Sequence, residues 1–269
     1  MRLLRRTVRK ARNRTSDRML DKLTVTTEGG GRRIKDVPPI TQHVDHVRVD
    51  ELAGVFEQYR GTLRADTALL LSQFSLADYV LRVVGVGSVG TRCYVLLLVG
   101  PSGEPLFLQA KEAPPSVLET YGGHRAQFER VAPVDRGHQG YRVVSGQRIL
   151  QAQSDPFLGW IGTWAAERDD RPPIDFYVRQ FRDMKGSLDT RGLTTSQYRA
   201  YVSLCAGVLA RAHSQSPGGA AIAGYLGRAD RFDQAVARWS IAYADQAEHD
   251  FDALEDAVRT GRLPAEHGV

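Results

Sequence analysis

A glycine-rich segment and a lysine that follows it are the residues with the clearest chemical potential. Gly85, Gly87 and Gly90 have the spacing G-x-G-x-x-G, and Lys111 follows Gly90 by 21 positions. Glycines at this spacing let backbone amides approach phosphate groups closely, and a lysine holds phosphates through its charge. The spacing alone does not identify a fold, because it occurs in dinucleotide-binding folds, in kinase-like folds and by chance.

The residues around the glycines narrow these alternatives. A dinucleotide-binding fingerprint needs a helix directly after the glycines, whereas residues 93–99 form an apolar run that predicts a strand. Residues 79–84 predict the strand before the glycines, residues 101–105 a tight turn, and residues 106–110 a third strand that leads to Lys111. This antiparallel meander favours a glycine-rich flap over nucleotide phosphates, as in kinase-like folds. A glycine-containing hairpin followed by an edge lysine is the simpler alternative.

The rest of the chain is predicted to frame this meander, mostly with helices. Residues 50–73 have helical periodicity, and residues 24–33 predict a break rich in threonine and glycine. Thr194, with Gln197 three residues later, has the spacing of a capping box at the start of a helix. Further helices are predicted at 116–121, 143–153 and 229–260, and further strands at 157–160 and 174–181. We therefore expect an α+β chain with a basic helical linker (1–78), a sheet and hinge (79–187) and a helical region (188–269).

Basic charge is concentrated at the start of the chain. The 269 residues carry 36 Lys and Arg against 31 Asp and Glu, a formal net charge of +5. Residues 1–22 alone carry nine basic and two acidic residues, so the other residues sum to a slightly negative charge. A basic arm can bind nucleic acid or an acidic membrane surface, but no aromatic residues alternate with these arginines to stack on bases. We expect a solvated or packed helix here, with no nucleic-acid or membrane partner.

Composition and cysteine content point to a cytoplasmic globular protein. Apolar residues make up 42% and charged residues 25% of the chain, which is ordinary for a soluble domain. The longest apolar run, residues 94–99, is too short to span a bilayer, and the N-terminus is too rich in arginine for a secretory signal. Cys93 and Cys205 provide neither a disulfide framework nor metal-ligand spacing. We therefore expect a reducing compartment.

Other polar groups have less specific patterns. His43 and His46 lie close in sequence, but a zinc site would need a third ligand that no spacing supplies, so no metal site is expected. Arg179 and the charged residues at 182, 183 and 185 lie at the end of a predicted strand. These residues either form an ion-pair network or contact a substrate or nucleotide, and the sequence does not decide between the two roles.

Seven segments have distinctive sequences: residues 83–94 (VVGVGSVGTRCY), 107–113 (FLQAKEA), 142–148 (RVVSGQR), 155–160 (DPFLGW), 176–187 (FYVRQFRDMKGS), 209–213 (LARAH) and 222–227 (IAGYLG). Together they resemble the bacterial family called domain of unknown function 2252, over about residues 10 to 262. That family is similar to the aminoglycoside-phosphotransferase branch of the kinase-like superfamily. The resemblance therefore implies a protein-kinase-like α+β fold, with an antiparallel small-lobe sheet, a glycine-rich flap and a helical region.

The resemblance also implies roles for individual residues. Lys111 matches the phosphate-binding lysine, and residues 176–185 match the strand and hinge between the lobes. Glu119 and Glu129 are the candidate acids that would orient the lysine, with Gln147 as a neutral substitute. ATP and Mg²⁺ are the implied cofactors. The implied nucleotide-binding residues are Gly85, Gly87, Ser88, Gly90, Lys111, Glu119, Gln180 and Arg182.

The chain also departs from the family pattern. Full-length members carry a Gly-Asp-x-His-x-x-Asn-Phe-Gly segment and a later Asp-rich strand, both before the glycine flap, as if the kinase order were circularly permuted. These resemble the catalytic base and the metal-binding aspartate of aminoglycoside kinases, and this chain contains neither. We therefore expect a truncated, nucleotide-binding fragment of a kinase-like phosphotransferase that is inactive alone, because phosphoryl transfer needs those groups. The alternative is a non-catalytic or pseudo-enzyme module that acts through protein association. A separately encoded N-terminal half that carries the catalytic loop is then an expected partner.

Overall fold

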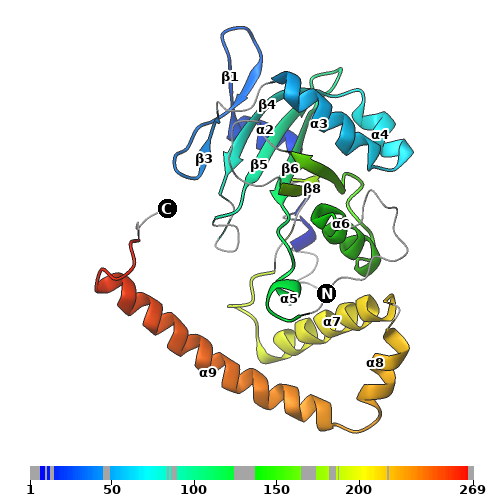
Figure 1. Ribbon diagram of the computed structural model, residues 1–269, viewed down its shortest axis with the longest axis vertical. Coiled ribbons are helices and arrows are strands. Elements are labelled where there is room, and N and C mark those ends of the chain that lie inside the picture. Colours follow the sequence, from blue (N-terminus) through cyan, green and yellow to red (C-terminus); the bar gives the residue numbers. More distant parts are fainter. Residues whose placement is uncertain are drawn as a thin grey trace. The chain divides into compact units, whose positions relative to one another are not determined.

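The computed structural model describes residues 7–9, 11–12, 15–44, 49–83, 85, 90–123, 137–164, 174–181, 186, 188–216 and 218–265. These residues form a six-stranded antiparallel sheet, a two-stranded sheet and a set of helices (Figure 1). The predicted α+β class is therefore confirmed. Residue contacts group the chain into two units, Met1–Gly207 and Val208–Val269, and each unit is described by itself.

The large sheet of the first unit has the strand order β3-β4-β5-β6-β8-β7, and all neighbouring strands are antiparallel. The predicted meander is its centre. β5 has the predicted bounds, β4 begins earlier than predicted, and β6 continues past its predicted end to include Lys111. The strands are β3 (Thr41–Gln42), β4 (Ser75–Arg82), β5 (Cys93–Val99), β6 (Pro105–Glu112), β7 (Gly159–Trp164) and β8 (Ile174–Gln180).

Alternation of side chains along the strands gives the large sheet two faces. Lys111 on β6 lies opposite Cys93 on β5 and Tyr177 on β8. These three side chains therefore share one face, which we call the lysine face. α6 (Gln139–Leu150) lies on this face, because its Tyr141 ring packs edge-on against Trp160, the residue paired with Tyr177, with 5.0 Å between ring centroids.

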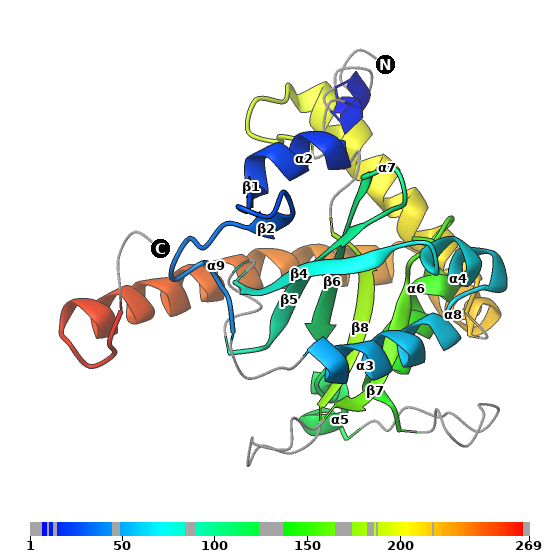
Figure 2. The ribbon, with the colours of Figure 1, turned by 90° about the horizontal axis from the view of Figure 1, so that it is seen from above.

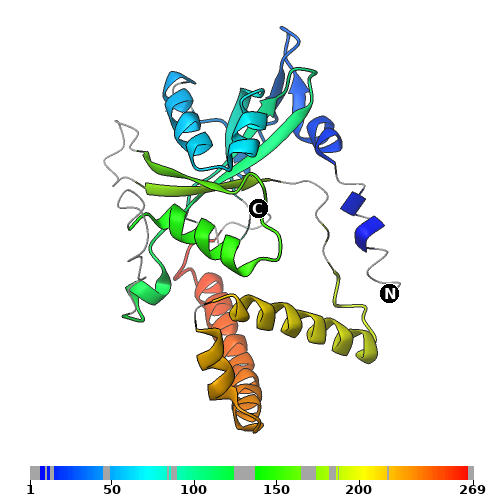
Figure 3. The same ribbon diagram turned by 90° about the vertical axis from the view of Figure 1, so that its right-hand side faces the viewer.

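The opposite face is covered by α3 (Val49–Gly61) and α4 (Ala65–Leu71), as Figures 1 and 3 show. Tyr59 of α3 is buried in the hydrophobic core of this face, and its hydroxyl donates a hydrogen bond to the Phe157 carbonyl at 2.6 Å. Sheet residues such as Leu108 belong to the same core. The two helices therefore fix the side of the sheet that does not carry Lys111.

A second core lies at one end of the lysine face. It forms where α2 (Ser16–Leu23) and the hairpin of β1 (Thr24–Thr26) and β2 (Arg32–Ile34) pack beside strands β4 to β6 (Figure 2). Met19 of α2 and Phe107 at the start of β6 are both buried there. The part of the lysine face around Lys111 does not belong to this core.

Several segments differ from the sequence prediction. The strand predicted at 157–160 is β7, which begins two residues later, and the helix predicted at 143–153 is α6, which begins and ends earlier. Residues 50–73 form two helices, α3 and α4, because Thr62 Oγ1 donates to the Tyr59 carbonyl at 2.7 Å and accepts from the Trp160 amide at 3.1 Å. These bonds tie the break between the helices to β7. Residues 24–33 contain strand residues of the β1–β2 hairpin, whose turn is closed by a 2.9 Å hydrogen bond from the Thr27 amide to the Gly31 carbonyl.

The predicted capping box is confirmed at the start of α7 (Thr195–Ser214). The Gln197 amide donates to Thr194 Oγ1 at 3.3 Å, and the Thr194 amide donates to Gln197 Oε1 at 3.0 Å. In the second unit, α8 (Gly219–Leu226) is followed by α9 (Arg231–Arg259), which matches the helix predicted at 229–260. None of the helices in the described part of the chain is long and apolar enough to cross a membrane.

Candidate functional site

The glycine-rich connection joins β4 to β5, and two of its glycines are described. Gly85 has φ 141° and Gly90 has φ 83°, a backbone region that residues with a Cβ rarely adopt. A Cβ at either position would meet no described atom within 4 Å. The backbone conformation, and not crowding, is therefore what requires glycine here. Gly87 and Ser88 lie outside the described residues.

Lys111 lies near the end of β6, at the centre of the strand order. It is half-buried, with Cys93 directly across on one side and Tyr177 on the other. Within the described part of the chain, its ammonium group has no hydrogen-bond or ion-pair partner. Lys111 is therefore a cation that is presented on the lysine face without a neutralising carboxylate.

Arg179 adds a second cation to the same face. It lies opposite Gln109 on β6, two residues from Tyr177 along β8, so it is one diagonal neighbour of Lys111 on this strand, and Asp175 is the other. Diagonal neighbours of an antiparallel pair are about 7–8 Å apart, within reach of two long side chains. The Arg179 Nε is buried and has no hydrogen-bond partner in the described part of the chain. The strand register thus brings two long basic side chains together over Gln109.

Arg82, at the end of β4, contributes a third positive charge. Its guanidinium carbon lies 5.7 Å from the centroid of the Phe181 ring, a cation–π arrangement. One guanidinium nitrogen donates to Thr41 Oγ1 at 2.7 Å, which connects Arg82 to β3. Arg82 therefore links the strand before the glycine-rich connection to the residue that follows β8.

Burial raises the pKa values of two residues that neighbour these cations, and the positive charges oppose the rise. Burial raises the pKa of the Cys93 thiol, while the charges of Lys111 and Arg82 and a 3.3 Å hydrogen bond from the Gln109 amide oppose the rise. Burial also raises the pKa of Tyr177, and the positive charge of Arg179 opposes it. The thiol and the phenol are therefore neutral at physiological pH. They therefore add no negative charge beside Lys111 and Arg179.

Carboxylates near the lysine face are engaged elsewhere. Asp175, two residues before Tyr177 on β8, accepts a 2.6 Å hydrogen bond from the Gln139 amide at the start of α6 and lies 3.5 Å from His138 Nε2. Glu112 follows Lys111 and therefore points to the opposite face, where it accepts from the Arg92 amide at 2.8 Å and Nε at 3.3 Å. The described surroundings of Lys111 and Arg179 therefore carry an excess of positive charge.

Several predicted site residues do not gather around Lys111. Glu119 lies on the short helix α5 (Val117–Thr120), and no ion pair joins it to Lys111 among the described residues. Gln180 is on β8, but its side chain lies on the opposite face. Its backbone amide donates to Asp155 Oδ2 at 2.8 Å. Gln147 is on α6, and no hydrogen bond joins it to Lys111 in the described structure. Arg182 and Glu129 lie outside the described residues.

The structure adds residues to the face that the motifs did not single out. Gln109, Tyr177 and Arg82 share the lysine face, and Cys93 belongs to it although the sequence marked it only as a thiol. The alternation of side chains along a strand could have placed Gln109 on the face of Lys111, because residues two positions apart in a strand share a face. Alternation alone could not say which residue of β8 would meet Lys111, since that depends on the register between distant segments.

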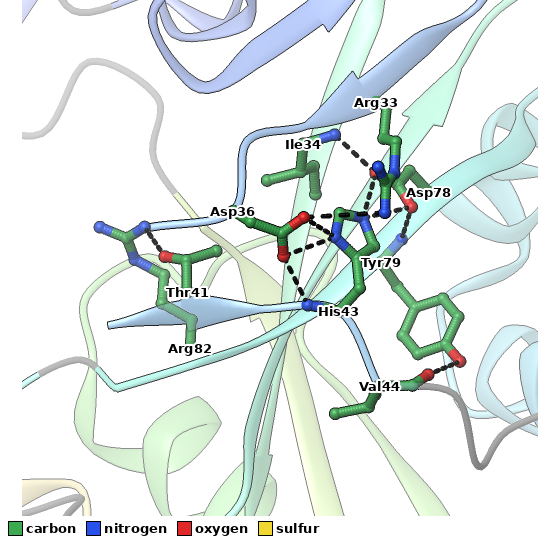
Figure 4. Close-up of polar contacts among 9 residues, drawn as sticks. All are labelled: Arg33, Ile34, Asp36, Thr41, His43, Val44, Asp78, Tyr79 and Arg82. Atoms are coloured by element: carbon green, nitrogen blue, oxygen red, sulfur yellow. Dashed lines mark hydrogen bonds and ion pairs between the residues drawn. The ribbon is translucent and has the colours of Figure 1, made fainter. Parts of the chain in front are cut away.

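A second polar cluster lies beside the first, where the segment between β2 and β4 folds back onto β4 (Figure 4). The His43 ring lies between two carboxylates: its Nδ1 is 2.8 Å from Asp36, and its Nε2 is 3.0 Å from Asp78 Oδ2. Asp78 also accepts from the Ile34 amide at 2.5 Å and the Tyr79 amide at 2.9 Å. The backbone and side-chain hydrogen bonds from His43 lower the pKa of Asp36.

This Asp36–His43–Asp78 cluster is a structural clamp that holds β3 on β4. The Val83 amide donates to the Ile40 carbonyl at 2.9 Å, so the pairing continues up to the glycine-rich connection. His46, the other histidine of the sequence pattern, lies outside the described residues. In the described part of the chain, no group of three or more His, Cys, Asp or Glu side chains is arranged to hold a metal ion.

Comparison with known proteins identifies the family. The family described as an uncharacterised protein conserved in bacteria (DUF2252) matches residues 1–257, and the chain belongs to this family. No curated protein and no solved structure gives a significant match to the chain. The family resemblance inferred from the sequence is therefore confirmed, and the further similarity to kinases stays a prediction.

Proposed function

We propose that the lysine face and the glycine-rich connection bind the phosphate groups of a nucleotide, and that the chain is a nucleotide-binding fragment of a kinase-like phosphotransferase. The observation that carries the proposal is the pairing of Lys111 and Arg179, two cations without a described carboxylate partner, on one face of the sheet. Gly85 and Gly90 border the same strands in conformations that favour glycine. Basic side chains and closely approaching backbone amides are the groups that bind phosphates in kinase-like sites.

The topology of the sheet supports the kinase-like part of the proposal. Strands β4-β5-β6-β8-β7 are neighbours in this order, and α6 is inserted in the chain between β6 and β7. A kinase small lobe also has the glycine-rich loop between its first two strands, the phosphate-binding lysine on the third, and a helix after it. α6 packs on the lysine face, the side on which a helix could approach the lysine.

The proposal concerns binding and stops before catalysis. Phosphoryl transfer needs carboxylates for metal ions and a group that positions or deprotonates the acceptor. The described residues do not provide a set of ligands that fits Mg²⁺. Lys111, Arg179 and the two glycines fit the phosphates themselves, so the residues of this chain would orient the polyphosphate and offset its charge.

Isothermal titration calorimetry tests the proposal. ATP is titrated into the wild-type chain and into Lys111→Ala, once with Mg²⁺ and once with a chelator. The matched control is Lys22→Ala, which removes an exposed lysine on α2. We expect the wild type and the control to bind alike and Lys111→Ala to bind at least about tenfold more weakly, because a charge-assisted contact to phosphate is lost. Equal binding by all three proteins, or no binding by any, would refute the proposal.

A further inference from the structure

The second cation of the lysine face, Arg179, makes a prediction about the form of the ligand. We propose that the site takes a nucleoside polyphosphate whose negative charge is not already neutralised by a divalent cation. This inference rests on the proposed function, because it concerns the same site. It differs from the expectation of bound Mg²⁺ that the kinase resemblance implies.

The first argument is the state of the Arg179 side chain. A guanidinium group stays protonated in proteins, and its N–H groups can only donate hydrogen bonds. The Nε of Arg179 is buried and has no acceptor among the residues that the structure describes. Buried donors without a partner are rare, and each calls for an explanation. An oxygen of a ligand bound on the lysine face supplies that acceptor.

The second argument is the count of charges around the site. Lys111 and Arg179 lie on the lysine face with the neutral Cys93 and Tyr177, and the Asp175 carboxylate of this face accepts a hydrogen bond from the Gln139 backbone amide. A polyphosphate with free oxygens offsets this positive charge directly. A bound divalent cation cancels part of the phosphate charge and so weakens the attraction to the arginines and the lysine.

The third argument is the absence of an anchor for such a cation among the described residues. Asp175 accepts from the Gln139 backbone amide and lies 3.5 Å from His138 Nε2, and Asp78 in the middle of β4 contacts His43 and accepts from the Ile34 amide. Neither carboxylate forms part of a three-ligand group in the described structure. On this proposal Lys111 and Arg179 bind the phosphate oxygens directly. In a metal-dependent site, carboxylates would hold a cation that binds them.

The chemistry of arginine adds a specific expectation for substitutions. A guanidinium group can give parallel hydrogen bonds to phosphate oxygens, whereas an ammonium group acts as a point charge. Arg179→Lys therefore keeps the charge but loses the fork of donors, and Arg179→Gln loses both. The order of affinities should be wild type, then Arg179→Lys, then Arg179→Gln.

The experiment compares ATP and inorganic tripolyphosphate by calorimetry with the full chain, in a chelator and in excess Mg²⁺. We expect the wild type to bind ATP at least several-fold more tightly in the chelator, and tripolyphosphate to compete with it. We expect Arg179→Gln to weaken ATP binding about tenfold or more, with Arg179→Lys intermediate. Arg191→Gln is the control, since the Arg191 side chain is 90% exposed and its ion pair in the described residues is with nearby Asp189. Thermal unfolding of each variant verifies that it is folded.

The outcomes separate this inference from the proposed function. Tighter binding of ATP with Mg²⁺, or unchanged affinity in Arg179→Gln, would overturn the inference. If Lys111→Ala still abolished the Mg²⁺-dependent binding, the proposed function would stand while the inference falls. The comparison of the two ATP forms uses the wild-type chain alone, so it decides the question even if both Arg179 variants fail to fold.

Discussion

Removal of the Asp78 carboxylate should destabilise the first unit strongly, and the structure allows the size of the effect to be worked out. The Asp78 side chain is 14% exposed, and the neighbouring His43 side chain is 17% exposed. Asp78→Ala leaves the Ile34 amide and His43 Nε2 without their acceptor. A buried donor that loses its partner costs roughly 1–3 kcal/mol, and a partly exposed one falls toward the lower end, about 1–2 kcal/mol, so the two together should cost about 2–4 kcal/mol.

Thermal unfolding followed by circular dichroism measures this cost. For a unit of this size, about 2–4 kcal/mol corresponds to a decrease in Tm of about 5–15 °C. Asp21→Ala is the matched control, because Asp21 is 79% exposed and lies 3.9 Å from its arginine partner Arg32. An exposed pair of this kind contributes at most about 1 kcal/mol. Asp78→Asn should fall between the two, since its amide oxygen can replace one acceptor.

The reasoning would be refuted if Asp78→Ala and Asp21→Ala had the same Tm. Such a result would mean that the amide and the ring find other acceptors, and that the clamp does not hold β3 on β4. A decrease in Tm for Asp78→Ala alone, with little change for Asp78→Asn, would instead assign the effect to one hydrogen bond and not to the charge.

Three further predictions address separate parts of the molecule. The pKa of Asp36 is lower in the folded chain than in the unfolded chain. The Asp36 carboxylate therefore stabilises the fold above its unfolded pKa, and this contribution is lost as the pH falls through the folded pKa. When Tm is measured at decreasing pH, it should fall less in Asp36→Asn than in the wild type. A thiol reagent should label Cys205 rapidly and the buried Cys93 slowly, and a fast thiol that persisted in Cys205→Ser would contradict the burial of Cys93. An apolar cavity of about 40 Å³ lies between α3 and the sheet. Val55→Ile adds a methylene group there and should raise stability by about 0.5–1 kcal/mol in urea unfolding, whereas a loss of stability would show that the cavity cannot accept it.

The sequence predicts the parts of this fold that depend on local patterns. The strand at Cys93–Val99 follows from a continuous apolar run, and the start of α7 follows from the spacing of Thr194 and Gln197. The break between α3 and α4 was missed because it depends on a tertiary contact. Thr62 bonds to Trp160, which lies 98 positions away in the chain, and no local pattern reveals such a bond.

For the candidate site too, the sequence predicts the residues of local motifs but not those that distant strands contribute. Gly85, Gly90 and Lys111 are visible as a motif, because their spacing is local. The partners of Lys111 on the lysine face come from β8, and the register between β6 and β8 decides that Tyr177 lies across and Arg179 lies diagonally. A shift of one residue would bring Gln180 to this face instead.

The clamp and the lysine face act on the same strand, and this gives the clamp a consequence for binding. Asp78 fixes the segment before β3, and β3 then holds Arg82 through Thr41 Oγ1. Arg82 is the last residue of β4, and Gly85 follows three positions later. The clamp therefore helps to fix the end of β4, from which the chain continues to Gly85. If the lysine face binds phosphates, Asp78→Ala should weaken that binding as well as lower Tm, although Asp78 lies in the middle of β4, four residues before Arg82. Unchanged ATP affinity in a destabilised Asp78→Ala chain would show that the glycine-rich connection is positioned independently of the clamp.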